Sequence, residues 1–523
     1  MKKCFALFLL LELTKISCGQ TQFNFRYGSP LYDRARKTIE TREGNYLVVG
    51  TTEGFGSAGN VFMMKVGVAG NIIWLKDYTG INWEEPYDII ELSDGKLVMC
   101  GTTNSYGAGS TDAFVMETDD SGNIIWAKAY GNILGESFYK IIEGKKGEGG
   151  FYVAGLAQKV QGGIEGTALL KLDTTGNIIW KKWLDAWCTE GSWYPIDITG
   201  ISSGGVALTG SRCGTSILCW KFSSVGNLMW SNSYTADAGG FTTGLAILED
   251  AVGNIYLNSN INGVAHSHDI AILKLQSNGN LTWLKTYGGT YTDWDRGIAN
   301  TRDTGIIVTG STNSAGNGDF DACLIKLSQN GSVQWANAYG SVWYETSANA
   351  IQTSDNGYLI TGQTFSFGTN TDSSKILLVK TDALGQSSCN SVSWTPIEGN
   401  ETVTITSTIA PDTLSLSVNS VTWPVHDRSF YEFNQCNVTS IWWSSDRGDL
   451  NALPNPFSNE LGFFIADQGQ GIVSLFNFLG QRVLQQAFSS STTINTERLA
   501  DGIYFYEISN DREILKTGKL IKQ

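Results

Sequence analysis

A five-residue sequence motif recurs along the chain at nearly constant spacing, and this period limits the folds that the chain can adopt. Close copies of Gly-Asn-Ile-Ile-Trp begin at Gly70, Gly122, Gly176, Gly226, Gly279 and Gly331. A seventh turn of the same kind ends at Gly385 but lacks the tryptophan. The spacing from Gly70 to Gly385 therefore averages about 52 residues per repeat. This period is typical of propeller blades and too long for leucine-rich or ankyrin units, so we expect seven such units.

Each unit contains four short runs with strand character. In the second unit these runs are residues 88–92, 96–101, 113–118 and 123–131. Tight Gly-containing turns join the first run to the second and the third to the fourth, whereas a longer Gly-, Ser- and Thr-rich loop joins the second to the third. Four antiparallel strands make one blade, so residues 20–390 are predicted to form an all-β, seven-bladed β-propeller.

The two ends of this region complement each other. Residues 22–28 match the fourth strand of a unit but have no first three strands before them, whereas the last unit, residues 348–382, has three strands and no fourth. Joining them would close the ring and pair two exposed sheet edges. We therefore expect the N-terminal strand to become the outer strand of the last blade.

The first 19 residues have the pattern of a secretory signal. Lys2 and Lys3 precede the apolar run 5–11, and small residues at Ser17 and Gly19 suit cleavage before residue 20. Cys18 also allows a lipoprotein interpretation, but Lys15 falls where an aliphatic residue is expected. Residues 1–19 are therefore predicted to be a signal peptide.

The net charge of the chain limits the kinds of partner that it can bind. The chain carries a net charge of −14, and the region between the signal and residue 450 carries −15. This region should repel phosphate backbones, so no nucleic acid is expected as a partner. Charged residues make up 16% of the chain and aromatic residues 11%, with 60 glycines, which excludes a coiled coil and a disordered chain and favours many strands joined by tight turns.

Seven cysteines remain beyond the signal, so at least one thiol should stay free. Cys100 and Cys323 lie in apolar, strand-like runs, where a buried thiol is expected. In an oxidising compartment, the pairs we expect to form disulfides are Cys213 with Cys219 and Cys389 with Cys436.

Sets of residues that support catalysis are scarce. The chain has three histidines, His266, His268 and His426, and no nucleophile elbow, zinc-protease or phosphate-loop motif. The Asp-x-x-Gly-Asn corners lack the ligand pattern of a calcium loop and are explained as hairpin turns. No catalytic residues and no metal site are therefore predicted.

One set of residues repeats at the same blade position. The loops that lead from the fourth strand of one blade into the next blade place aromatic residues beside acids. The candidate ligand-binding residues are Tyr32, Asp33, Trp83, Glu84, Glu136, Tyr139, Trp193, Asp293, Trp294, Trp343, Tyr344 and Glu345. Aromatic rings can stack on sugars, and acids can accept hydroxyl or amide protons or hold calcium. Alternatively, each acid caps its own loop and the aromatic packs against the neighbouring blade.

The propeller region resembles secreted bacterial propeller repeats that read approximately W-x-K-x-Y-G, then D-G-G-Y-L-V-x-G, then D-x-x-L-x-K. Residues 283–288, 355–362 and 269–274 carry these motifs. This resemblance covers residues 22–390 and implies the propeller fold, but no particular activity.

The composition changes near residue 450, after a segment, 391–449, that contains two period-2 runs. These runs, 402–406 and 414–418, indicate a β-like linker that is either a tether or an ornament on the propeller. Residues 450–523 have alternating apolar residues and Gly turns, which predict a small Ig-like β-sandwich.

This last region resembles the type A C-terminal sorting domain of the type IX secretion system of Bacteroidetes. The resemblance rests on a Pro-Asn-Pro start, a turn strand at 477–483, a Leu-x-x-Gly-x-Tyr strand at 499–504 and a Lys-x-x-Lys end. The residues assigned to sorting are Pro454, Asn455, Pro456, Gly480, Gly502, Tyr504 and Lys519. The resemblance implies export to the cell surface or medium, with the type IX machinery as a partner.

Two functions follow from these observations. The first is a secreted or surface-attached propeller that binds a glycan or protein ligand without catalysis, with no cofactor other than a possible calcium ion. The alternative is a polysaccharide-active enzyme, a glycoside hydrolase or lyase, that uses paired carboxylates on the propeller face.

Overall fold

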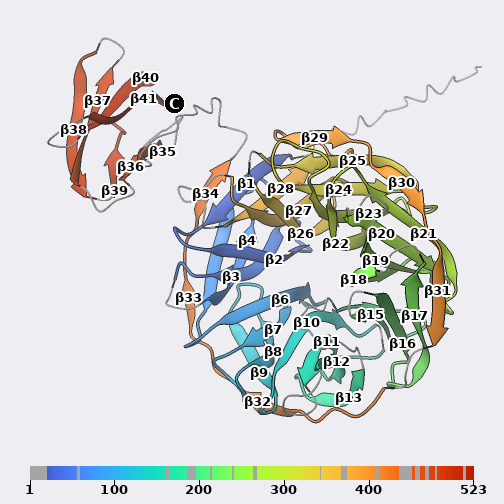
Figure 1. Cartoon of the computed structure of the whole chain (residues 1–523). Helices are drawn as coiled ribbons and strands as arrows, with labels where there is room; N and C mark the ends of the chain where they lie inside the picture. The colour runs from blue at the N-terminus through green and yellow to red at the C-terminus, as the bar shows by residue number, and fades with distance from the viewer. Residues whose placement is uncertain are drawn as a thin grey trace, which may run out of the picture. The chain divides into compact units, whose positions relative to one another are not determined.

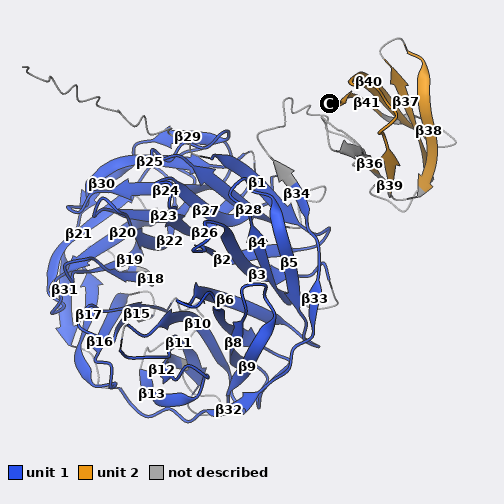
Figure 2. Ribbon diagram, turned by 180° about the vertical axis from the view of Figure 1, so that it is seen from behind, with its two compact units in different colours: residues 1–438 blue, residues 439–523 orange. Residues whose placement is uncertain are grey.

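The computed structural model describes residues 21–522 apart from 56–58, 146, 159–164, 185–195, 213–214, 238–240, 263–267, 342, 367–373, 408–410, 435–449, 454–459, 466–469, 478–479, 490 and 510–513. Every regular element in these residues is a β-strand, and the chain divides into two compact units, residues 1–438 and 439–523 (Figures 1 and 2). The described residues include no helix long and apolar enough to cross a membrane. The signal-peptide segment 1–19 lies outside the described residues.

Seven antiparallel sheets surround a central axis and form the blades of a β-propeller (Figure 1). Blade 1 contains β2 (Asp33–Glu40), β3 (Tyr46–Thr52), β4 (Asn60–Val66) and β5 (Ile72–Tyr78). Blade 2 contains β6 (Glu84–Glu91), β7 (Leu97–Thr103), β8 (Asp112–Thr118) and β9 (Ile124–Gly131). Blade 3 contains β10 (Glu136–Glu143), β11 (Phe151–Gln158), β12 (Glu165–Leu172) and β13 (Ile178–Leu184).

The remaining blades repeat this order, and the predicted seven-bladed propeller is confirmed. Blade 4 contains β14 (Asp197–Gly200), β15 (Val206–Arg212), β16 (Ser216–Phe222) and β17 (Leu228–Ala236). Blade 5 contains β18 (Phe241–Glu249), β19 (Ile255–Asn262), β20 (His268–Leu275) and β21 (Leu281–Gly288). Blade 6 contains β22 (Asp293–Asn300), β23 (Ile306–Thr312), β24 (Asp321–Leu327) and β25 (Val333–Tyr339). Blade 7 contains β26 (Glu345–Gln352), β27 (Tyr358–Thr364), β28 (Lys375–Thr381) and β1 (Phe23–Gly28).

The middle strands of the blades are buried along their whole length. Every residue of β3, β4, β7, β8 and β23 is buried, because neighbouring blades cover both faces of each sheet. This double burial explains why their sequences are continuous apolar runs rather than alternating ones.

The repeated glycine and the repeated tyrosine of the sequence meet across the gap between blades. The tyrosine near the end of a fourth strand donates its hydroxyl to the carbonyl of the glycine in the next blade's last turn. The Oη–O distances are 2.7 Å for Tyr78 to Gly122, 2.6 Å for Tyr130 to Gly176, 2.7 Å for Tyr234 to Gly279, 2.6 Å for Tyr287 to Gly331 and 2.6 Å for Tyr339 to Gly385. These glycines also have positive φ, between 72° and 87°, a conformation in which a residue with a side chain would be strained.

The N-terminal strand closes the ring, as predicted. β1 pairs antiparallel with β28, from Phe23 opposite Lys380 to Tyr27 opposite Ile376. Phe23 is buried in a cluster that joins blades 7 and 1. β1 is not the outermost strand, however, because a further strand, β34 (Tyr431–Asn434), pairs with its other edge.

Residues 391–434 wrap around the outside of the propeller, and we call this segment the belt. Its strands are β29 (Ser391–Trp394), β30 (Ile397–Asn400), β31 (Val403–Ser407), β32 (Ser417–Ser420), β33 (Val425–Asp427) and β34. They add a fifth antiparallel strand to blades 6, 5, 4, 2, 1 and 7, in that order (Figure 1). At blade 3 the belt makes one bridge, between Asp412 and Trp183. The belt therefore covers edges that would otherwise stay open.

The belt is anchored by apolar side chains in the gaps between blades. Leu414, Trp423 and Phe430 are buried in three different interblade clusters. The Trp423 ring lies 4.8 Å from that of Tyr106 and 5.2 Å from that of Phe114. The linker segment is thus integrated into the first compact unit by packing as well as by hydrogen bonds.

One predicted disulfide is wrong. Cys219 is a free, fully buried thiol in an apolar cluster between blades 4 and 5. It lies opposite Thr209 in the pairing of β15 with β16. Cys213 lies outside the described residues. Cys100 and Cys323 are free and buried, as expected.

For the second expected disulfide, the partner of Cys389 stays a prediction. Cys389, just before the belt begins, is disulfide-bonded. The proposed partner, Cys436, lies outside the described residues.

The second compact unit is a small sandwich. Its strands are β35 (Leu450–Leu453), β36 (Glu460–Ile465), β37 (Gln470–Asn477), β38 (Arg482–Ser489), β39 (Ser491–Asn495), β40 (Gly502–Ser509) and β41 (Ile514–Lys522). β38 and β39 pair only through Ser489 and Ser491, which divides the strands into a group of three and a group of four. Both groups contribute to one core, which includes Phe463, Val473 and Tyr506.

Candidate functional site

The connections from a fourth strand to the next blade's first strand lie at one end of the strands, together with those between second and third strands. We call this end of the propeller the loop face and the opposite end the hairpin face. Five predicted acids begin first strands at the loop face: Asp33, Glu84, Glu136, Asp293 and Glu345. Each of them is 0–1% exposed. The structure therefore places these carboxylates inside the loops rather than on an open surface.

The buried acids hold the loops that precede them. A backbone N–H four residues earlier donates to the carboxylate, at 2.6 Å from Ser29 to Asp33, 2.7 Å from Gly289 to Asp293 and 2.9 Å from Ser341 to Glu345. A threonine at the end of the second strand donates to the other oxygen, at 2.6 Å for both Thr52 to Asp33 and Thr364 to Glu345. Asp33 and Glu345 thus each tie two neighbouring loops together.

Burial dominates the electrostatics of these acids. It raises the pKa of Glu84 to about 7, against the lowering effect of hydrogen bonds from Ser105 and Thr103. It also raises the pKa of Glu136 to about 7 and raises the pKa values of Asp33 and Asp293. The loop face therefore contains several carboxyl groups that bind protons more tightly than exposed acids do.

The predicted aromatic residues divide into two groups. Trp83 packs over Gly59, Tyr139 makes an edge contact with Tyr87 at 4.7 Å, and Trp294 lies over His268 at 4.3 Å, so these rings are engaged within the propeller. Tyr32 is half-buried. Trp193 lies outside the described residues.

The other group is open to solvent. Trp343 is 53% exposed, and Tyr344 is 36% exposed while its ring contacts those of Phe320 and Phe365 at 5.5 and 6.0 Å. The rings of Tyr344, Phe320 and Phe365 therefore form an aromatic patch at the junction of blades 6 and 7, next to Trp343 in the chain.

Sequence reasoning missed four further residues of the loop face. Each precedes a buried acid by two or three positions, and each is more than half exposed: Leu31, Ile81, Ile133 and Tyr291. Together with Trp343 they form a set that we call the apolar ring. The signal was present as one large apolar residue at the same place in five loops, but an aliphatic side chain in a loop suggests no chemistry when taken alone.

The first strands also carry ion pairs that the sequence did not predict. Arg36 pairs with Glu85, Lys37 lies 3.8 Å from Asp88, and Lys140 lies 3.3 Å from Asp197. Each pair joins neighbouring blades, because the partners belong to consecutive first strands. These pairs link the innermost strands around the axis.

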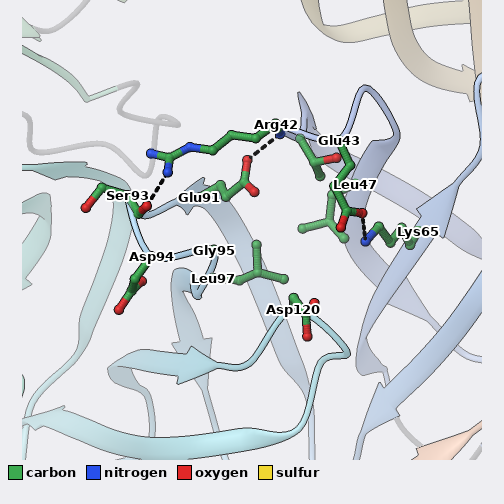
Figure 3. Close-up of a pocket in the computed structure, with 11 residues that line it drawn as sticks. Arg42, Glu43, Leu47, Lys65, Glu91, Ser93, Asp94, Gly95, Leu97 and Asp120 are labelled. Atoms are coloured by element: carbon green, nitrogen blue, oxygen red, sulfur yellow. Dashed lines mark hydrogen bonds and ion pairs between the residues drawn. The ribbon is translucent and has the colours of Figure 1, made fainter.

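A pocket of about 360 Å³ lies on the hairpin face between blades 1 and 2 (Figure 3). Its acidic groups are engaged by neighbouring donors, because Lys65 Nζ lies 2.8 Å from Glu43 and the backbone N–H of Arg42 donates to the Glu91 carboxylate at 2.9 Å. Arg42 also donates to the Ser93 carbonyl. The pocket is lined by turn residues and by residues of β3, β4, β6 and β7, and none of them is a predicted site residue. Among the described residues, no cluster of three or more His, Cys, Asp or Glu could hold a metal ion.

The residues assigned to sorting lie in the second unit. Gly480 and Gly502 have φ of 77° and 146°, so both adopt conformations that favour glycine. Tyr504 is buried and donates its hydroxyl to the Ala500 carbonyl at 2.7 Å, whereas Lys519 is exposed on β41. Pro454, Asn455 and Pro456 lie outside the described residues.

Comparison with known families agrees with this sandwich. Residues 451–523 match the secretion system C-terminal sorting domain. The chain thus carries a type IX sorting domain, and the protein is exported to the cell surface or the extracellular space. No curated protein is significantly similar in sequence to the chain.

Several solved structures resemble the chain at low sequence identity. A protein of unknown function from Bacteroides caccae is 9% identical, with 60% of this chain and 93% of that chain covered and a TM-score of 0.31. The extracellular domain of a protein described as a hybrid two-component system from B. thetaiotaomicron is 11% identical, with 95% and 57% covered and a TM-score of 0.35. NanB, solved with Optactamide, is 10% identical, with 70% of both chains covered and a TM-score of 0.35. Identity at this level carries no information on activity.

Proposed function

We propose that this exported propeller is a non-catalytic binding protein that holds an extracellular glycan or protein on its loop face. The observation that carries the proposal is the apolar ring, in which Leu31, Ile81, Ile133, Tyr291 and Trp343 expose more than half of their surface at equivalent places in five loops. Exposed apolar groups gathered on one face are typical of interaction surfaces.

The aromatic members of the apolar ring indicate that the ligand binds to the part of the loop face near blades 6 and 7. Tyr291 and Trp343 belong to consecutive loops, and the aromatic patch adjoins Trp343. Flat rings that stay exposed can stack on the apolar faces of sugars or receive apolar side chains of a protein. The buried acids support this surface by holding its loops in place.

The enzymatic alternative gains no support from the described residues. Hydrolysis by paired carboxylates needs two acids that face a substrate across one cleft. The five acids at the loop face are at most 1% exposed.

Binding screens of the full exported chain test this proposal. We expect a ligand to be retained from arrays of glycans and matrix proteins, and expect Tyr291→Ala and Trp343→Ala to weaken its binding at least tenfold, the effect of losing an interfacial aromatic anchor. Tyr431→Ala is the matched control, because Tyr431 is 62% exposed on the belt and Tyr291 is 61% exposed on the loop face. Turnover of a polysaccharide without stable binding would contradict the proposal.

A further inference from the structure

Three junctions between blades contain a second acid beside the loop-holding acid. Asp112 and Asp321 are buried, and Asp269 is half-buried with its Oδ1 atom inaccessible to solvent. The second acid lies at the start of a third strand, and its neighbour begins the first strand of the next blade. The pairs are Asp112 with Glu136, Asp269 with Asp293, and Asp321 with Glu345. In each case a glycine lies between them at the end of the fourth strand: Gly131 ends β9, Gly288 ends β21 and Gly340 directly follows β25.

The geometry is clearest at Asp321 and Glu345. A Cβ on Gly340 would lie 1.7 Å from Asp321 Oδ1 and 2.7 Å from Glu345 Oε2, so the two carboxylates share one small space that only glycine leaves open. Asp321 is 1% exposed and Glu345 is fully buried.

The same arrangement occurs at the other two junctions. A Cβ on Gly131 would lie 1.8 Å from Asp112 Oδ1 and 2.8 Å from Glu136 Oε2. A Cβ on Gly288 would lie 2.1 Å from an oxygen of Asp269 and 3.1 Å from one of Asp293.

The surrounding donors favour ionised carboxylates. Asp321 Oδ2 accepts the N–H groups of Asn317 and Gly318, at 2.8 and 3.3 Å. Glu345 accepts the Ser341 N–H and the Thr364 hydroxyl, at 2.9 and 2.6 Å. Hydrogen bonds of this kind stabilise the charged form of an acid.

One oxygen of the pair is left without a partner. Asp321 Oδ1, which points into the shared space, is buried and accepts no hydrogen bond. Burial, together with the charge of Glu345, raises the pKa of Asp321 to about 7. A buried negative oxygen beside a second carboxylate is costly unless a positive charge compensates it.

The junction between blades 7 and 1 shows such a compensation. Lys375 takes the place of the second acid there, and its Nζ lies 3.8 Å from Asp33 Oδ2. A Cβ on Gly28 would meet Lys375 Cδ at 2.5 Å and Asp33 Oδ2 at 2.8 Å, so the arrangement around this glycine is the same. At this junction the chain supplies its own cation.

We propose that the Asp321–Glu345 pair binds a divalent cation, and that the Asp112–Glu136 and Asp269–Asp293 pairs bind one each. A charge of +2 balances two carboxylates, and calcium prefers carboxylate, carbonyl and water oxygens. Extracellular calcium modules bind with millimolar to submillimolar affinity, which fits sites with only two charged ligands on an exported protein. The ions would join neighbouring blades at the base of the loop face.

Calcium titration of the full exported chain tests this inference. After treatment with EDTA, we expect about 1 mM calcium to raise the midpoint of thermal unfolding by several degrees, and expect calorimetric titration to count three ions. Asp321→Asn should lower the count by one. Asp321→Lys, which copies the Lys375 arrangement, should also lower it by one and should raise the midpoint in EDTA above that of the parent.

A gain of binding provides the complementary test. Lys375→Asp should add one ion to the count and lower the midpoint in EDTA, because it creates a fourth pair with Asp33. Asp120→Asn, at an exposed acid in a hairpin turn, is the control and should change neither value. Absence of bound calcium by calorimetry would overturn the proposal, whatever the effect of Asp321→Asn on stability in EDTA. The result is independent of any ligand on the apolar ring.

Discussion

Glu84 illustrates how single residues at the loop face couple burial to charge. Its carboxylate is fully buried at the start of β6, accepts a hydrogen bond from the Ser105 hydroxyl, and lies 3.3 Å from the Thr103 hydroxyl. Burial raises its pKa to about 7, so the folded protein binds a proton that the unfolded chain releases near pH 4.5. The stability that this protonation contributes is present at low pH and is lost as the pH rises to about 7.

Glu84→Gln should remove this pH dependence. We expect the variant to be more stable than the parent above pH 7 by on the order of 2–3 kcal/mol, and the difference to shrink as the pH falls towards 4.5. Denaturant unfolding at several pH values measures the free energies. Ser105→Ala should have the opposite effect, because the Ser105 hydroxyl lowers the pKa of Glu84. Parallel pH curves for Glu84→Gln and the parent would contradict the prediction.

A second residue-scale prediction concerns the tyrosines that join blades. Tyr130→Phe leaves the Gly176 carbonyl without its partner at 2.6 Å and should lower the free energy of unfolding by about 1–3 kcal/mol. Guanidinium unfolding gives the value. Tyr291→Phe, at an exposed tyrosine, should cost less than about 0.5 kcal/mol. Equal effects of the two substitutions would argue against a structural role for the interblade hydrogen bond.

At the scale of elements, the N-terminal strand and the belt both complete sheets that the repeats leave open. β1 lies between β28 and β34, so its loss would expose two edges. Deleting residues 20–28 should lower the free energy of unfolding by on the order of 3–6 kcal/mol, because the burial of Phe23 and Phe25 is lost as well. A deletion variant that unfolds at the parental temperature would contradict the register described here.

The belt can be tested by a single anchor. Trp423→Ala removes a ring buried against Tyr106 and Phe114 and should destabilise the propeller by about 3–5 kcal/mol. Limited proteolysis should then cut the belt faster than in the parent. Trp343→Ala, which truncates an exposed tryptophan, serves as the control and should leave both the stability and the cutting rate unchanged.

At the scale of the whole molecule, the chain forms two compact units. The sorting domain has its own core, built from both groups of its strands. Removing residues 451–523 should therefore leave the propeller folded but stop its export, so that it collects in the periplasm of a host with the type IX system. Cell fractionation with an antibody to the propeller measures this distribution. Surface display of the truncated protein at parental levels would contradict the assignment.

Two substitutions separate the fold of the sorting domain from its recognition. Gly502→Val should reduce export by destabilising the domain, because φ of 146° strains a β-branched residue. Lys519→Ala should reduce export while the domain stays folded, because the side chain is exposed. Measuring the thermal unfolding midpoint and the exported fraction of each variant distinguishes the two effects. Gly502→Val should lower both values, whereas Lys519→Ala should lower only the exported fraction.

The sequence alone determined the features that depend on local repetition. The number of blades, their four strands and the closure by residues 22–28 all follow from turn glycines and apolar runs that recur at a fixed period. The sorting domain could be predicted as well, because its motifs are close together in the chain. Tertiary structure decided what depends on contacts between distant segments. The path of the belt around the blades, the free state of Cys219 and the inward direction of Asp33 and Glu345 are set by packing against neighbouring blades. No local pattern encodes which side of a loop faces solvent, so the apolar ring became visible only when the blades were assembled.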